Sequence, residues 1–116
     1  MKATFKELPL FEKLRDTYFD DDSFKDFQEE LMKNPEAGVQ IKKTGGLRKV
    51  RYGDERRGKG KRSGLRVIYY WKDDEDQFWL FTVYDKDEAD DLTDDERKTL
   101  KTVLQNEIKA RSAKDD

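Results

Sequence analysis

The chain has 116 residues, the size of one compact domain, and 45% of them are charged whereas only 34% are hydrophobic. This composition would favour disorder if the apolar residues were scattered, but they gather in dense runs over residues 65–71 and 78–84, which predict a folded core. The sequence contains no cysteine and no apolar run of about 18 residues, so it predicts neither a disulfide framework, nor a thiol nucleophile, nor a membrane span. Because residues 1–10 also lack the apolar segment of a secretory signal, we expect a cytoplasmic protein.

The charges are distributed unevenly along the chain. The net charge is only −2, yet residues 42–72 carry 12 basic and 2 acidic side chains, whereas residues 73–116 carry 7 basic and 15 acidic ones. An acidic protein with one strongly basic central segment has a localised cationic surface. The distribution therefore indicates a polyanion as the partner of that segment.

The N-terminal third predicts a short strand followed by a helical hairpin. Residues 2–6 alternate in polarity and form the candidate first strand, and Pro9 stands at a natural first-turn position of a helix over about 9–19. A second helix is capped by Asp22 or Ser23 and stops at Asn34. The apolar residues expected on the buried faces of the two helices are Leu10, Phe11, Leu14, Tyr18, Phe24, Phe27, Leu31 and Met32.

The middle of the chain predicts three meandering strands. Gly45 and Gly46 open a short alternating strand over about 47–52. Residues 65–71 and 78–84 are rich in β-branched and aromatic side chains, which predicts a β-hairpin.

The last part of the chain predicts a long helix. Thr93 and Glu96 fit a capping box at the start of a helix over about 94–111. Its expected buried stripe consists of Leu100, Val103, Leu104 and Ile108. The predicted fold is α+β, a small antiparallel-rich twisted sheet in the order β-α-α-β-β-β-α with two N-terminal helices and a C-terminal helix packed on it. We expect a single domain over residues 1–111 and a disordered tail over 112–116.

Cationic side chains stand out on two of the strands. The two-residue period of a strand places Lys49 and Arg51 on one face. Arg66 interrupts an apolar run, shares a face with Ile68 and Tyr70, and therefore needs a carboxylate or phosphate partner. The alternatives are an internal salt bridge between Arg66 and the last helix, and a solvated strand face for Lys49 and Arg51.

The loop between these strands, over residues 56–63, carries five further cations among glycines. This pattern favours salt-sensitive contacts with a nucleic-acid backbone that depend little on base sequence, although a flexible soluble connection is the alternative. The five cations are Arg56, Arg57, Lys59, Lys61 and Arg62.

The residue types present restrict the chemistry. With no histidine and no cysteine in the chain, the imidazole pair of ordinary ribonucleases and the common zinc sites cannot be formed. Ribose carries its own nucleophile, the 2′-OH, so an enzyme can cleave RNA by aligning that hydroxyl with the phosphorus while lysine and arginine neutralise charge. A lysine whose pKa is lowered by other cations is a possible base, whereas arginine is not.

Three segments of the sequence are similar to a known family. TGGLRKVRY (44–52), GKGKRSGLRVIYYW (58–71) and TVYDKDEADDLTDDE (82–96) resemble the HigB branch of the RelE/ParE-like toxins of type II toxin–antitoxin systems, and the likeness spans roughly residues 3–110. The resemblance implies a metal-independent endoribonuclease, an mRNA interferase that cleaves translated messenger RNA on the ribosome and so inhibits translation. It implies contacts with ribosomal RNA, neutralisation by a cognate HigA-like antitoxin, no cofactor and no membrane partner.

The resemblance also implies roles for individual residues. By similarity, Arg66 stabilises the scissile phosphate, and Lys49 and Arg51 bind phosphate or polarise the 2′-OH. A basic residue that follows the third meander strand in the family falls on Lys86, which would help the leaving oxygen.

One feature of the family is missing. RelE carries a tyrosine near the start of the last helix that stacks on the substrate base, and Leu92 stands at the corresponding position. Tyr84 substitutes for that tyrosine if it faces the cleft, and is otherwise a core residue. Arg48 and Tyr52 lie close to the basic strand and are expected as secondary RNA-binding residues.

Two other function classes remain open at this point. A non-catalytic RNA- or ribosome-binding module on the same fold would use the same cations. An acidic inhibitor or nucleic-acid mimic would use residues 73–116, although their charge more readily keeps the body of the protein off RNA. The sequence does not specify the codon preference, the general base, the antitoxin docking surface or the oligomeric state.

Overall fold

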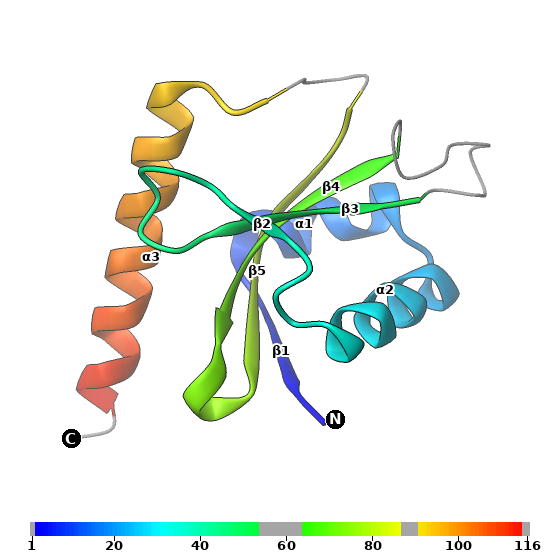
Figure 1. The fold of residues 1–116 in the computed structure, drawn as a ribbon, viewed down its shortest axis with the longest axis horizontal. Helices are drawn as coiled ribbons and strands as arrows, with labels where there is room; N and C mark the ends of the chain where they lie inside the picture. The colour runs from blue at the N-terminus through cyan, green and yellow to red at the C-terminus, as the bar shows by residue number, and fades with distance from the viewer. Residues whose placement is uncertain (1, 54–63, 87–90, 115–116) are drawn as a thin grey trace.

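The computed structural model describes residues 2–53, 64–86 and 91–114, which form a five-stranded sheet with helices on both faces (Figure 1). The α+β class and the order of the predicted elements are confirmed, and the two-residue strand β2 is an addition that the sequence did not predict. The helices and strands are β1 (Thr4–Glu7), α1 (Pro9–Tyr18), α2 (Asp21–Lys33), β2 (Val39–Gln40), β3 (Arg48–Tyr52), β4 (Leu65–Lys72), a 3-10 turn (Asp73–Glu75), β5 (Gln77–Asp85) and α3 (Asp94–Lys114).

The strands lie in the order β1-β5-β4-β3-β2. β3, β4 and β5 form the predicted antiparallel meander, whereas β1 pairs with β5 in parallel at the edge of the sheet. The β4–β5 register shifts by one residue, because Ile68 lies opposite Thr82 but Tyr69 lies opposite Leu80. This bulge leaves Phe81 as the extra residue of β5.

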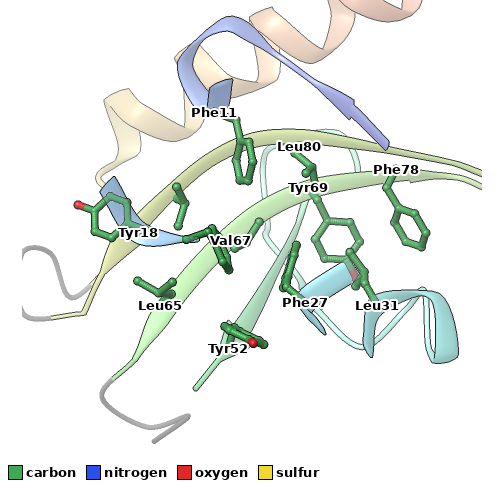
Figure 2. Close-up of a cluster of buried hydrophobic side chains, with 12 residues drawn as sticks. Phe11, Tyr18, Phe27, Leu31, Tyr52, Leu65, Val67, Tyr69, Phe78 and Leu80 are labelled. Carbon is green, nitrogen blue, oxygen red and sulfur yellow. The ribbon is translucent and has the colours of Figure 1, made fainter. Parts of the chain in front are cut away.

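One face of the sheet packs against α1 and α2 and holds the larger core (Figure 2). Leu65, Val67 and Tyr69 alternate along β4 and therefore project to this face. There they join Phe11 of α1 and Phe27 of α2 in one cluster of buried side chains. The predicted apolar faces of the two helices are confirmed except at Leu10, which is half exposed.

The opposite face of the sheet packs against α3 and holds a smaller core. Ile68 and Trp79 from the sheet are fully buried against Leu104 of α3. The predicted stripe was wrong for Val103 and Ile108, which are 38% and 37% exposed. Among the described residues, α3 packs against the sheet on one side only. The buried stripe of the helix is therefore narrower than the spacing of its apolar residues predicted.

Side-chain caps define where the helices begin. The Asp20 carboxylate accepts a hydrogen bond from the Ser23 backbone N–H at 2.7 Å, so α2 starts at Asp21 and the cap is Asp20 rather than Asp22 or Ser23. The predicted capping box of α3 is confirmed, since the Glu96 N–H donates to Thr93 Oγ1 at 3.1 Å and the Thr93 N–H donates to Glu96 Oε1 at 2.8 Å.

The far end of α3 differs from the expectation. The helix continues to Lys114, so residues 112–114 are helical and do not belong to a disordered tail. The helices within the described ranges are too short or too polar to span a membrane.

Candidate active site

The meander brings three of the predicted cations to the face of the sheet that α3 covers. In the β3–β4 ladder, Arg51 lies directly opposite Arg66, and Lys49 lies directly opposite Ile68. Directly opposed residues of an antiparallel pair project from the same face. The structure therefore brings Lys49, Arg51 and Arg66 to one face; strand periodicity predicted that Lys49 and Arg51 share a face, and the family resemblance grouped Arg66 with them.

Arg66 is the buried member of this group and is only 4% exposed. Its Nη1 donates to the backbone carbonyls of Gly64 and Leu65, at 3.2 and 3.3 Å. Burial lowers the pKa of Arg66 most, and the neighbouring Arg51 lowers the pKa further. Because a guanidinium nevertheless keeps its charge, the site is a buried cation with a second cation beside it, which favours an anionic ligand.

Lys49 contacts Asp91, an acidic residue of the segment that precedes α3. Its Nζ lies 3.4 Å from Oδ1 of Asp91, and Oδ2 of the same carboxylate lies 3.4 Å from Nη2 of Arg97. The backbone N–H of Leu92 also donates to Oδ1 of Asp91 at 2.8 Å. The hydrogen bond from the Leu92 N–H lowers the pKa of Asp91 most, and Lys49 and Arg97 lower it further.

Asp91 and Arg97 are site residues that the sequence reasoning missed. Lys49 and Asp91 are 42 positions apart, and their contact depends on where the segment before α3 lies relative to β3. No periodicity or motif within either segment signals such a contact, so only the tertiary structure reveals it.

Lys86 joins the site through its main chain. Its backbone N–H donates to the Gly64 carbonyl at 3.3 Å, the same carbonyl that accepts from Arg66. The side chain of Lys86 is exposed. The end of β5 thus lies beside the start of β4, next to the buried guanidinium.

A groove of about 470 Å³ lies between α1 and the start of α3, and Asp91, which contacts Lys49, is part of its lining. Tyr84 and Leu92 line it together with Leu10, whose exposure this position explains. Tyr84 lies opposite Arg66 in the β4–β5 ladder. Its hydroxyl is buried and has no hydrogen-bond partner among the described residues, and burial raises its pKa, as does nearby Asp91.

Arg48 and Tyr52 do not belong to this group. They project from the other face of the sheet, where Arg48 lies opposite Tyr69 and donates to the Gly38 carbonyl at 2.8 Å. Tyr52 is 8% exposed and donates to Oδ2 of Asp26 at 2.7 Å. Their polar groups are engaged within the protein, which argues against the expectation that they bind RNA.

The five loop cations expected to bind RNA lie outside the described residues. They are Arg56, Arg57, Lys59, Lys61 and Arg62. Within the described ranges, acidic side chains form no group that would hold a metal ion.

No protein-family model matches the chain. Among solved structures, the chain is similar to the E. coli toxin RelE, which was determined in the free state as a mutant with two arginines replaced by alanine. The match has a TM-score of 0.49 and 14% sequence identity, and it covers 78% of this chain and 90% of that chain.

Proposed function

We propose that the protein is the toxin of a type II toxin–antitoxin system, a metal-independent endoribonuclease that cleaves translated messenger RNA and is neutralised by a cognate HigA-like antitoxin. The observation that carries the proposal is the buried Arg66, which lies opposite Arg51 on the face that also holds Lys49. Two opposed guanidinium groups destabilise a strand pair. A polyanion that lies across both of them would relieve this repulsion, which supports the proposal.

In the proposed reaction, the 2′-oxygen attacks the adjacent phosphorus and the bond from phosphorus to the 5′-oxygen breaks. The products are a 2′,3′-cyclic phosphate and a 5′-hydroxyl. Arg66 stabilises the charge that develops on the phosphate, and Lys49 and Arg51 hold the RNA so that the 2′-OH lies in line. Lys86 protonates the leaving 5′-oxygen, and water takes up the proton of the 2′-OH.

The test is a cell-free translation reaction with added purified protein, followed by primer extension on the message. We expect the unaltered protein to produce cuts only on translated message. Arg66→Ala and Lys86→Ala should each lower the cleavage rate by about a hundredfold or more, because each removes a group that stabilises the transition state. Lys25→Ala is the matched control, since Lys25 is an exposed lysine on α2, beyond the other face of the sheet.

The alternative function is a non-catalytic RNA- or ribosome-binding module. The ion pair between Lys49 and Asp91 favours this alternative, because one cation of the site is already paired with an acidic side chain. Under this alternative, translation stops or proceeds while the message stays intact, and Arg66→Ala changes binding alone. Cuts that persist in Arg66→Ala would contradict the nuclease proposal as stated.

A further inference from the structure

The cationic face contains an anion that belongs to the protein itself. The two oxygens of the Asp91 carboxylate contact cations from two different elements, Lys49 of β3 and Arg97 of α3, each at 3.4 Å. The side chains of Lys49 and Arg97 are only 24% and 23% exposed, whereas that of Asp91 is 55% exposed. The two cations are therefore the more firmly held part of the bridge.

The contacts of Asp91 match those that an RNA phosphate would make. A phosphodiester also presents two anionic oxygens on one atom, and lysine and arginine recognise carboxylate and phosphate through the same charge-assisted hydrogen bonds. Strong bonds of this kind measure about 2.7–2.9 Å. At 3.4 Å, the contacts of Asp91 with Lys49 and Arg97 are longer than this, so the two cations hold the carboxylate weakly, and its short hydrogen bond is the one from the Leu92 N–H at 2.8 Å.

The guanidinium of Arg97 has a hydrogen-bond donor that the Asp91 contact does not use. Its Nη2 contacts Asp91, while its Nε is buried and finds no hydrogen-bond acceptor within the described ranges. Buried polar groups in proteins nearly always have a partner, so a buried guanidinium N–H without one needs an explanation. A phosphate placed closer to Arg97 than the carboxylate, with its oxygens spread tetrahedrally, would supply that acceptor.

We propose that Lys49 and Arg97 form a phosphate clamp between β3 and α3, which Asp91 occupies in the free protein and which a backbone phosphate of single-stranded RNA takes over. The choice of RNA as ligand rests on the proposed function. Arg97 is then an RNA-binding residue of the site, and Asp91 is an intramolecular competitor that weakens RNA binding.

The competing explanation is that Asp91 serves only to hold α3 against the sheet. The two explanations differ in the sign of one effect. If Asp91 competes with phosphate, its neutralisation strengthens RNA binding. If Asp91 only holds α3 in place, its neutralisation leaves RNA binding unchanged or weakens it, because Arg97 moves away from Lys49.

The experiment is fluorescence anisotropy with a 2′-O-methyl oligoribonucleotide, which the protein cannot cleave because the 2′-OH is blocked. Asp91→Asn keeps an oxygen for the Leu92 N–H and should tighten binding about two- to fivefold, the range of an exposed ion pair. Arg97→Gln should weaken binding by a similar factor and should reduce the dependence on salt, since one phosphate contact is lost.

Two controls isolate the clamp. Asp94→Asn makes the same change in charge three residues away, at the exposed start of α3, and should leave affinity within about 1.5-fold at physiological salt, where exposed charges are screened. In a Lys49→Gln background, Asp91→Asn should lose its gain, because the cation that it frees is gone. Thermal melts of each variant establish that it is folded.

The clamp is refuted if Asp91→Asn binds no tighter, if Asp94→Asn gives the same gain, or if the gain persists without Lys49. These outcomes are independent of the nuclease proposal. Intact message together with a gain in Asp91→Asn would refute cleavage and keep the clamp, whereas cut message with unchanged anisotropy would refute the clamp alone.

Discussion

Arg51 and Arg66 occupy directly opposed positions on β3 and β4, so their two guanidinium groups project from the same face of the sheet. Like charges in this relationship destabilise an antiparallel pair. Burial is the main cause that lowers the pKa of Arg66, and the neighbouring Arg51 adds to it. The two guanidinium groups thus repel each other, and removing either charge relieves that repulsion.

Replacing Arg51 should therefore separate stability from activity. Arg51→Gln removes one of the opposed charges, so we expect the free energy of unfolding in urea to rise by up to about 1 kcal/mol. RNA cleavage should fall by about tenfold or more, because a group that aligns the substrate is lost. Arg48→Gln is the matched control on the same strand, and it should lower stability, since Arg48 donates to the Gly38 carbonyl at 2.8 Å. An Arg51→Gln protein less stable than the unaltered chain would contradict the prediction.

The buried hydroxyl of Tyr84 should also reduce stability. It has no hydrogen-bond partner among the described residues, and a buried polar group without a partner costs about 1–3 kcal/mol. We expect Tyr84→Phe to raise the midpoint of thermal unfolding, while cleavage changes less than about threefold because the hydroxyl does not reach the surface. A large loss of cleavage in Tyr84→Phe would show instead that the hydroxyl contacts RNA during the reaction.

Tyr69 is the opposite case, because its buried hydroxyl is fully used. It accepts a hydrogen bond from the Gly38 N–H at 3.0 Å and donates to the Pro35 carbonyl at 2.7 Å. Tyr69→Phe would leave both backbone groups without this partner, so we expect a loss of about 1–3 kcal/mol in the free energy of unfolding at pH 7.

The contribution of the Tyr69 hydroxyl to the free energy of unfolding should depend on pH. Burial raises the pKa of Tyr69 above its ordinary value of 10.0. The stability that the protonated phenol provides is thus fully present below pH 10 and is lost as the pH rises toward the folded-state pKa. Urea titrations from pH 8 to 11 should show the gap between the unaltered protein and Tyr69→Phe narrowing above pH 10. A constant gap would contradict the assignment.

The sequence predicted the elements well because each is locally consistent. The capping box at Thr93 and Glu96 starts α3 where expected, and the alternation in β4 correctly placed Arg66 on one face with Ile68 and Tyr70. The parallel pairing of β1 with β5 and the short strand β2 were not predicted. Both depend on partners far away in the chain rather than on a pattern within the strand.

The candidate site was predicted only in part for the same reason. Strand periodicity placed Lys49 and Arg51 on one face, and the family resemblance added Arg66. Neither describes contacts between the sheet and the segment around the start of α3, so Asp91 and Arg97 were missed. Arg48 and Tyr52, expected to bind RNA, lie on the other face of the sheet. Both lie next to the basic residues in sequence, which is what the expectation relied on, yet adjacent residues of a strand project to opposite faces.

The packing of α3 gives a last prediction. Leu104 is 1% exposed between the helix and the sheet, whereas Ile108, one turn later on the same predicted stripe, is 37% exposed. Leu104→Ala leaves a cavity beneath α3 and should lower the free energy of unfolding by about 2–5 kcal/mol. Ile108→Ala removes contacts that are already partly solvated, so its loss should stay below about 1 kcal/mol. Urea denaturation of the two variants measures both values. Equal losses would mean that α3 is buried along its whole apolar stripe, as the sequence alone suggested.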